Sequence, residues 1–414
     1  MECFDLVVIG GGSAGLASAI AAYDHGVKKI LILEKDLYLG GILLQCIHNG
    51  FGLTKYKEEL TGPEYADRYL HELLKREIEF KVQSMVLRVT PDLKVHYSNS
   101  KDGFKIIQSR AIIMATGCSE RTRGAINIPG NRIPGVLTAG LAQKYLNIDG
   151  YLVGKRVFIL GSGDIGLIMA RRMTLEGVNV LGVAEIMPYS NGLSRNIVQC
   201  LHDFNIPLYL HHTVKRIIGK NHLEKIIVAE VDDQFKFIPN TDREFEVDTL
   251  MLSVGLIPSI PLIENIGVIV HPKTKGPVVD ESFMTSIPGI FACGNALHVH
   301  DLVDFVSLES EKTGLAVANY LSKTIDEHRY LQVVAGRDLN YILPSKVDLN
   351  KISRVNFNFR VTKPLYDIYL NIILNGKVVK KVKKAFMLPA EMESIEIPIE
   401  LLDEGTLEVE VAYA

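Results

Sequence analysis

The stretch Leu6-Val7-Val8-Ile9-Gly10-Gly11-Gly12-Ser13-Ala14-Gly15 decides the fold of the N-terminal part of this chain. The apolar run predicts a buried strand, and the glycines after it predict a tight turn into a helix. Gly10 permits the turn, Gly12 lets a pyrophosphate approach the backbone, and Gly15 lets the helix pack closely on the strand. A second apolar run, 30–33, ends at Glu34, whose carboxylate can bind ribose hydroxyl groups. The stretch therefore predicts a βαβ unit that binds a dinucleotide.

The same pattern occurs again in the middle of the chain. Gly161-Ser162-Gly163-Asp164-Ile165-Gly166 follows the apolar run 157–160, and the next predicted strand ends at Glu185. The same number of residues separates the first glycine from the acid in both copies, which predicts two nucleotide sites and electron transfer between two cofactors. A carboxylate at Glu185 would repel a 2′-phosphate, so we expect NAD rather than NADP at the second site. The alternative is that one copy folds but binds nothing.

Composition excludes several classes of protein. The chain has 414 residues, a formal net charge of −3 and no apolar run long enough to cross a bilayer, so we expect neither nucleic-acid binding nor membrane insertion. Its five cysteines are scattered and form no CxxC pair, which argues against a disulfide framework and a metal site. We therefore expect a soluble cytoplasmic protein of two or three domains.

Other segments predict further strands, turns and a last helix. Buried strands end in glycine turns at Ala115-Thr116-Gly117 and at Gly255, and a helical pattern runs from Phe305 to Ile325. The tail differs, because Val355, Phe357, Phe359 and Val361 alternate with polar residues. Asn375-Gly376, between two apolar runs, predicts a hairpin. We predict a small antiparallel β-sandwich for the tail, which either packs and promotes oligomerisation or docks a partner.

With these motifs the chain resembles, over residues 4–325, the two-dinucleotide-binding-domain flavoproteins of the pyridine nucleotide–disulfide oxidoreductase superfamily. The resemblance implies FAD at the first fingerprint, NAD(P)H at the second, and an FAD domain interrupted by the NAD domain. We therefore expect an α/β protein with two Rossmann-like domains, FAD-binding at 1–121 and 258–330 and NAD-binding at 122–257. We expect residues 331–414 to form a β-rich, sandwich-like C-terminal domain.

The resemblance also implies which residues bind each cofactor. Asn295 replaces the aspartate that usually binds the ribityl chain of FAD, and an amide still forms hydrogen bonds there. The residues expected at the FAD site are Gly10, Gly12, Ser13, Ala14, Gly15, Glu34, Lys35, Gly40, Gly41, Gln45, Met85, Ala115, Thr116, Gly117, Gly294 and Asn295. Those expected at the NAD site are Gly161, Gly163, Asp164, Ile165, Gly166, Glu185 and Gly255.

The chain departs from the disulfide reductases after Gly40-Gly41. The positions of their cysteine pair are occupied by Leu43 and His48. The segment 45–52 and the run His298-Val299-His300-Asp301 are similar to FAD/NAD-dependent subunits associated with glycerol-3-phosphate dehydrogenase. They are more distantly similar to FAD-bearing subunits of opine, proline and sarcosine oxidising complexes. This resemblance implies a component of a multi-subunit dehydrogenase.

Cys46 and His48 fall where the resemblance places the reactive face of the flavin, and they are our candidate catalytic residues. Cys46 is either a redox thiol or a small residue that lines the pocket. His48 is either a general acid/base or a hydrogen-bonded pocket residue.

Two other groups of histidines have weaker interpretations. For His298 and His300, with Asp301 and Asp304, we favour flavin contact or helix capping over metal binding. The pair His211-His212 is interpreted as the end of a strand without chemistry.

The resulting expectation is an FAD-dependent NADH oxidoreductase in which hydride passes between NADH and the flavin. Electrons then pass to or from a partner subunit, a quinone-like acceptor or oxygen, and we expect the chain to be oligomeric. One alternative is an FAD dehydrogenase or oxidase subunit that oxidises an amine or alcohol directly. Another is a flavin-binding scaffold without catalysis.

Overall fold

The computed structural model describes residues 1–322, 329–350 and 353–413. These residues form two compact units, one of Met1–Cys118 with Pro258–Ala414 and the other of Ser119–Ile257. The chain therefore leaves the first unit, builds the second, and returns.

The first unit is organised around a mostly parallel sheet. Strand β1 (Cys3–Ile9) lies between β2 (Ile30–Leu33) and β8 (Gly103–Met114) and pairs with both in parallel. The sheet order is β5-β2-β1-β8-β7-β6, with β19 also paired to β8. All four residues of β2 are buried, as expected for a strand covered on both faces. The remaining strands of this sheet are β5 (Glu79–Lys81), β6 (Met85–Val89), β7 (Lys94–Asn99) and β19 (Ile290–Ala292).

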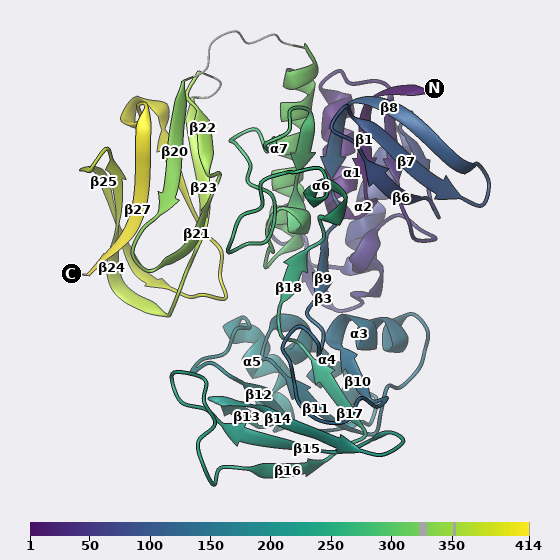
Figure 1. Ribbon diagram of the computed structural model, residues 1–414, viewed down its shortest axis with the longest axis vertical. Coiled ribbons are helices and arrows are strands. Elements are labelled where there is room, and N and C mark those ends of the chain that lie inside the picture. The colour runs from purple at the N-terminus through teal and green to yellow at the C-terminus, as the bar shows by residue number, and fades with distance from the viewer. Residues whose placement is uncertain (323–328, 351–352, 414) are drawn as a thin grey trace. The chain divides into compact units, whose positions relative to one another are not determined.

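Two helices pack against one another in this unit. Helix α1 (Ser13–Asp24) begins at the glycine turn, and α7 (Val303–Ser322) lies beside it (Figure 1). Gly314 makes this close approach possible, because a Cβ atom there would lie 2.3 Å from the Ser18 carbonyl oxygen. The observed α7 confirms the helical pattern predicted from Phe305. The last three predicted residues, 323–325, lie outside the described residues.

Shorter elements complete the first unit. Helix α2 (Gly62–Leu74) begins with a capping box in which Thr61 and Glu64 bond reciprocally. The other elements are the 3-10 helices η1 (Gly41–Gln45) and η3 (Gly294–Ala296), the strands β3 (Asn49–Phe51) and β4 (Leu60–Thr61), and helix α6 (Pro261–Glu264).

The second unit contains a five-stranded parallel sheet in the order β10-β17-β11-β12-β13. Helix α4 (Asp164–Leu175) follows the second glycine turn, as α1 follows the first. The parallel strands are β10 (Val136–Thr138), β11 (Arg156–Leu160), β12 (Asn179–Glu185), β13 (Leu208–Leu210) and β17 (Thr249–Leu252). A three-stranded antiparallel sheet is formed by β14 (His212–Gly219), β15 (Leu223–Glu230) and β16 (Arg243–Glu246), and the other helices are α3 (Ala139–Asn147), α5 (Ser194–Cys200) and η2 (His202–Phe204). Strands β9 (Cys118–Glu120) and β18 (Leu256–Pro258) pair with each other.

The C-terminal residues form two β-sheets around one apolar core (Figure 1). The larger sheet has the order β22-β20-β27-β24-β25 and the smaller one β21-β23-β26. The predicted hairpin is present, with Asn375 and Gly376 at positive φ between β24 and β25. The prediction of a purely antiparallel domain was wrong, because β20 and β27 pair in parallel. The strands are β20 (Tyr330–Ala335), β21 (Leu339–Leu343), β22 (Lys346–Asp348), β23 (Arg354–Val361), β24 (Leu365–Leu374), β25 (Lys377–Met387), β26 (Glu393–Pro398) and β27 (Gly405–Tyr413), with η4 (Ile399–Leu401) between the last two.

The core of this domain explains the alternating pattern in its sequence. Val355, Phe357, Phe359 and Val361 all point into the core, whereas Tyr413 at the end of β27 is exposed. Tyr341 and Leu343 of β21 instead join a core cluster of the parallel sheet. The C-terminal domain is therefore packed against the first nucleotide-binding fold within the same compact unit. Among the described residues, no helix is long and apolar enough to span a membrane.

Candidate active site

The first glycine turn, just before α1, contacts the Glu34 side chain. Gly10 has a φ of +106°, and a Cβ atom there would lie 2.3 Å from the Ala115 carbonyl oxygen, so only glycine fits without displacement. The backbone N–H of Gly11 donates to Glu34 Oε2 at 2.6 Å, and the N–H of Asp36 donates to Oε1 at 2.8 Å. These bonds hold a buried carboxylate at the end of β2, where a nucleotide ribose binds in folds of this type.

The second glycine turn repeats this arrangement around Glu185. Gly161 has a φ of +95°, and its Cβ atom would lie 2.1 Å from the Ser253 carbonyl oxygen. The N–H of Ser162 donates to Glu185 Oε2 at 3.0 Å, and the N–H of Met187 donates to Oε1 at 3.0 Å. Both copies of the fingerprint therefore hold their acid by equivalent backbone bonds.

The second copy is reinforced by side-chain bonds. The Ser162 hydroxyl donates to Glu185 Oε2 at 2.6 Å and accepts the Asn191 N–H at 2.9 Å. Asp164, at the start of α4, accepts the Leu193 N–H at 2.8 Å and the Asn196 amide at 2.6 Å. The loop after β12 is thus fixed against the second glycine turn. Ile165 packs against the core of this unit.

The turns that close the first nucleotide-binding fold meet near Asn295. The Thr116 hydroxyl donates to the Ser259 carbonyl at 2.6 Å, and the Ser259 N–H donates to the Gly117 carbonyl at 2.9 Å. The Asn295 amide donates to Cys118 Sγ at 3.6 Å, while its oxygen accepts the His300 N–H at 3.0 Å. In the second unit the Gly255 carbonyl accepts the Arg121 N–H at 3.0 Å.

The segment after Gly40-Gly41 lies directly against the first glycine turn. Gly40 and Gly41 have φ values of +116° and +59°, and the Gly40 N–H donates to the Gly11 carbonyl at 2.8 Å. Cys46 follows this segment, and its thiol donates to the Ile42 carbonyl at 3.3 Å. Burial raises the pKa of Cys46 to about 12. The thiolate, which is the nucleophilic form, is therefore disfavoured at this position.

His48 occupies a different environment from Cys46. Its Nδ1 lies 3.0 Å from the Asn49 carbonyl, so in the neutral ring Nδ1 carries the proton and Nε2 is the basic nitrogen. The ring lies 4.9 Å from that of Phe51. The loop that follows is fixed by Asp304, whose carboxylate accepts the N–H groups of Gly52, Thr54 and Lys55. Asp304, for which helix capping was one interpretation, thus joins the start of α7 to the His48 loop.

His298 and His300 converge on a carboxylate that sequence reasoning missed, Glu309 of α7. His298 Nε2 lies 2.8 Å and His300 Nε2 3.3 Å from Glu309 Oε2, and the other oxygen of Glu309 accepts the Gly294 N–H at 2.9 Å. Burial opposes ionisation of Glu309, but the two histidines outweigh it and hold its pKa below the ordinary range. The pKa of His298 is lowered, chiefly by burial. The cluster orders the Gly294–Asn295 turn.

The three ligand atoms of this cluster lie within 4.8 Å of one another, a spacing that a metal ion could use. Two observations favour an internal ion pair instead. Within the described residues, His298 Nδ1 has no hydrogen-bond partner, whereas a metal-bound histidine normally donates its other ring N–H. In addition, the Arg360 guanidinium already supplies a positive charge beside His298.

Three further residues predicted for the FAD site are Gln45, Lys35 and Met85. Gln45 is buried at the end of η1, Lys35 is exposed, and Met85 begins β6. Ser84, just before Met85, donates its N–H to the Glu34 carbonyl at 2.8 Å, which places this strand beside the ribose-binding acid. His211 lies between β13 and β14, and His212 is the first residue of β14, so the pair lies at strand ends as predicted.

Sequence reasoning missed five residues of the site, namely Cys118, Ser162, Ser253, Glu309 and Arg360. Ser162 and Ser253 lie within or beside predicted motifs, and the Ser253 hydroxyl accepts the Gly166 N–H at 3.1 Å. Their positions could have been noticed, because a serine next to a ribose-binding acid is a natural donor. Glu309 and Arg360 carry no local signal, because each is defined by side chains distant in the sequence.

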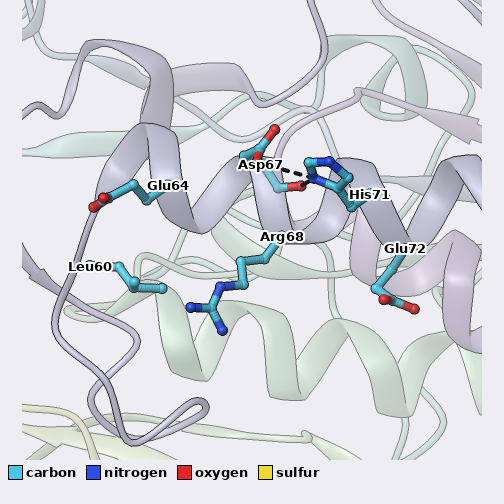
Figure 2. A pocket seen from close by; sticks show the side chains of 6 residues that line it. All are labelled: Leu60, Glu64, Asp67, Arg68, His71 and Glu72. Atoms are coloured by element: carbon cyan, nitrogen blue, oxygen red, sulfur yellow. Dashed lines mark hydrogen bonds and ion pairs between the residues drawn. The ribbon is translucent and has the colours of Figure 1, made fainter.

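A surface depression of about 310 Å³ lies elsewhere, on the exposed side of α2. Figure 2 shows its lining side chains, most of them from α2, with His71 bonded to Asp67. Arg68 also pairs with Glu58. Exposed ion pairs of this kind contribute little to stability. The lining contains no predicted site residue. Its residues are Leu60, Glu64, Asp67, Arg68, His71 and Glu72.

Comparison with known proteins agrees with this geometry. The family model for pyridine nucleotide-disulphide oxidoreductases matches residues 4–318. The chain belongs to this family. Membership confirms the predicted superfamily, and it makes the chain an oxidoreductase with FAD and a pyridine nucleotide as cofactors.

Two curated relatives show how broad the family is. An opine oxidase subunit of Agrobacterium tumefaciens (strain Ach5) is 24% identical over 323 residues, which cover 71% of this chain and 61% of the relative. NAD(P)H sulfur oxidoreductase (CoA-dependent) of Pyrococcus abyssi (strain GE5 / Orsay) is 27% identical over 311 residues, which cover 72% of this chain and 64% of the relative. This chain thus spans less than two thirds of the length of these relatives.

Solved structures share the fold. Thioredoxin reductase of T. acidophilum covers 77% of this chain and 99% of its own length, with a TM-score of 0.63 and 23% identity. L-proline dehydrogenase of P. horikoshii covers 75% of this chain and 54% of its own length, with a TM-score of 0.53 and 20% identity. These similarities confirm the α/β fold class.

The described residues fit the two cofactors. At the second glycine of the first GxGxxG fingerprint, Gly12, a Cβ atom would meet only Gly41 Cα, at 3.8 Å, so the backbone is open where a pyrophosphate approaches. Both helices that follow the turns offer N-terminal N–H groups to phosphate. Each turn also has a buried carboxylate for a ribose.

Proposed function

We propose that this chain passes hydride between NADH and FAD and exchanges electrons with a partner subunit or a small acceptor, as a component of a multi-subunit dehydrogenase. The observation that carries the proposal is the equivalent fixing of Glu34 and Glu185 by backbone N–H groups of their own glycine turns. Two turns built alike support two nucleotide-binding sites, rather than one site and one copy that folds but binds nothing.

The residues of the chain bind and orient the cofactors. Glu34 and the turn 10–15 hold the adenosine and pyrophosphate of FAD, and Glu185 with the turn 161–166 holds those of NADH. When bound, the flavin supplies a two-electron acceptor and the nicotinamide supplies the hydride. Glu185 favours NADH over NADPH because its carboxylate repels a 2′-phosphate. Asn295 contributes a neutral amide where a carboxylate is usual in the superfamily.

The residues after Gly40-Gly41 indicate where electrons go when they leave the flavin. Leu43 and His48 replace the cysteine pair, and the half-buried Cys46 thiol, whose pKa is raised, is poorly suited to accept electrons as a thiolate. Electrons therefore leave the flavin for an acceptor outside this chain, or arrive from a donor outside it. The opine oxidase relative, by its name one subunit of a larger enzyme, supports a partner subunit.

The decisive experiment is a visible spectrum of the purified chain followed by anaerobic titration with NADH. We expect a flavin band that bleaches with about one equivalent of NADH, because one hydride reduces one flavin. A flavin band that NADH does not change would contradict the proposed hydride transfer. A colourless protein that cannot be loaded with FAD would contradict the cofactor assignment itself.

His48 favours a second candidate, an FAD dehydrogenase subunit that oxidises an amine or alcohol directly. Because Nδ1 lies 3.0 Å from the Asn49 carbonyl, the proton of the neutral ring sits on Nδ1 and Nε2 is the basic nitrogen, as a general base for a substrate requires. This candidate predicts that an amino acid, an opine or glycerol 3-phosphate bleaches the flavin while NADH does not. His48→Asn should abolish such bleaching, whereas in the leading proposal it leaves reduction by NADH intact.

A further inference from the structure

A single arginine of the C-terminal domain contacts the segment that follows the flavin-binding turn. Arg360, on β23, has a side chain that is only 14% exposed, and its guanidinium pairs with the Asp301 carboxylate. It also donates to the Val299 carbonyl at 3.2 Å. Arg360 thus binds both residues that flank His300.

The same guanidinium is anchored on its own domain. It donates to the carbonyls of Pro389 at 3.0 Å and Ala390 at 2.7 Å, and to the Tyr341 hydroxyl at 3.3 Å. Asp301 is held from the same side, because its second oxygen accepts the Met392 N–H at 2.7 Å. A planar guanidinium with five donors suits such a set of acceptors, whereas an ammonium group does not.

His300 connects this contact to the flavin-binding turn. Its N–H donates to the Asn295 side chain at 3.0 Å, and its Nδ1 lies 3.0 Å from the His298 carbonyl. His300 Nε2 faces Glu309, which in turn accepts the Gly294 N–H. A shift of the segment 299–301 would therefore move both the Asn295 side chain and the Gly294 backbone.

The charge of Arg360 is balanced within this contact. Its guanidinium pairs with the Asp301 carboxylate, and both side chains are largely buried. Removing the guanidinium would leave Asp301 mostly buried without its partner, at 16% side-chain exposure. An unpaired buried carboxylate is unfavourable, so the segment would rearrange toward water.

We propose that Arg360 is a positioning residue for FAD, through which the C-terminal β domain sets the affinity of the flavin site. Arg360 acts through Asp301 and His300 on Asn295 and Gly294. The C-terminal domain thereby gains a role in cofactor binding. The inference rests on the assignment of FAD to the first fingerprint, and it does not depend on whether NADH is the electron donor.

The test compares four variants of the full chain, R360Q, R360K, D301N and R354Q. Arg354 lies on the same strand, but its side chain is 70% exposed and pairs with Glu396 at the surface, so R354Q is the matched control. The flavin is stripped and FAD is added back, and the dissociation constant is measured from the change in flavin fluorescence. The thermal midpoint of each protein is measured with and without FAD.

We expect R360Q and D301N to weaken FAD binding about tenfold, a usual size for coupling between sites, with R360K intermediate and R354Q unchanged. The rise in thermal midpoint on adding FAD should be smaller in R360Q and D301N than in R354Q. A purely structural role predicts lower midpoints without FAD but an unchanged dissociation constant, and that result would overturn the proposal. If R360Q does not fold, R360K and D301N decide by the same comparison. Wild-type protein that binds no FAD would instead contradict the cofactor assignment.

Discussion

The Ser162 hydroxyl donates a 2.6 Å hydrogen bond to Glu185 Oε2, the same oxygen that accepts the Ser162 backbone N–H. The first fingerprint has Gly11 at this position, so the bond to Glu34 there comes from the backbone alone. The hydroxyl of Ser162 also accepts the Asn191 N–H. Ser162 therefore fixes the Glu185 carboxylate and the loop after β12 together.

We predict that Ser162→Ala raises the KM for NADH roughly tenfold with a much smaller change in kcat, because a hydrogen bond to a charged group is lost at the ribose-binding acid. Steady-state kinetics with an artificial electron acceptor would measure both constants. Ser100→Ala, in an exposed turn of the first unit, serves as the control. An unchanged KM would show that Glu185 needs no hydroxyl to hold its position.

Replacing each of the two acids should affect the two cofactors separately. We predict that Glu185→Ala lowers the ratio of kcat/KM for NADH to that for NADPH by roughly tenfold or more, because repulsion of the 2′-phosphate is lost. Flavin content should stay at the wild-type level. Glu34→Ala should instead lower flavin occupancy. Each variant is the control for the other, and loss of flavin in both would point to misfolding rather than to two ribose sites.

Local patterns in the sequence predicted the two glycine turns, both acids and the Asn375-Gly376 hairpin. Such features depend on residues a few positions apart, through φ angles and the periodicity of apolar side chains. Glu309 and Arg360 could not be predicted in this way. Glu309 lies inside a helix whose sequence shows only a helical pattern, and its partners come from the preceding turn.

The parallel pairing of β20 with β27 was missed for a related reason. Each strand alternates as a strand of a sandwich should, and the alternation is the same whichever direction its neighbour runs. The direction depends on where the long connection between them passes. Sequence alone therefore predicted that this domain is β-rich, but not the relative directions of its paired strands.

The buried cluster around Glu309 should make the protein sensitive to acid. Burial lowers the pKa of His298, so on unfolding below about pH 6.5 this residue takes up a proton that it does not hold in the folded state. The pKa of Glu309 is also lowered, so its contribution to stability is present above its ordinary range and is lost as the pH falls through its folded value. Both effects reduce the free energy of unfolding in acid.

We predict that His298→Gln loses less unfolding free energy on acidification than the wild type does. Urea unfolding at about pH 7.5 and about pH 5.5 would give the difference in unfolding free energy for each protein. His71→Gln is the matched control, because the His71 side chain is 67% exposed on α2. An equal loss of unfolding free energy between the two pH values in the wild type and in His298→Gln would exclude His298 as a source of the effect.

Glu309→Gln should lower the free energy of unfolding by about 3 kcal/mol at neutral pH, because it removes the charged partner of two buried histidines.

Cys46 should behave as an unreactive thiol rather than as a redox centre. Its pKa of about 12 lies well above the ordinary value of 9.0, so almost no thiolate forms at neutral pH. We predict that iodoacetamide alkylates the exposed Cys3 within minutes while Cys46 stays unmodified up to about pH 9, as peptide mass spectrometry would show. Because the folded pKa is raised, the stability that Cys46 contributes is complete below pH 9 and declines above it.

We also expect Cys46→Ala to retain the wild-type rate of flavin reduction by NADH. Rapid alkylation of Cys46 at neutral pH, or a new absorption band beyond the flavin peak that disappears in Cys46→Ala, would show instead that a thiolate forms beside the flavin.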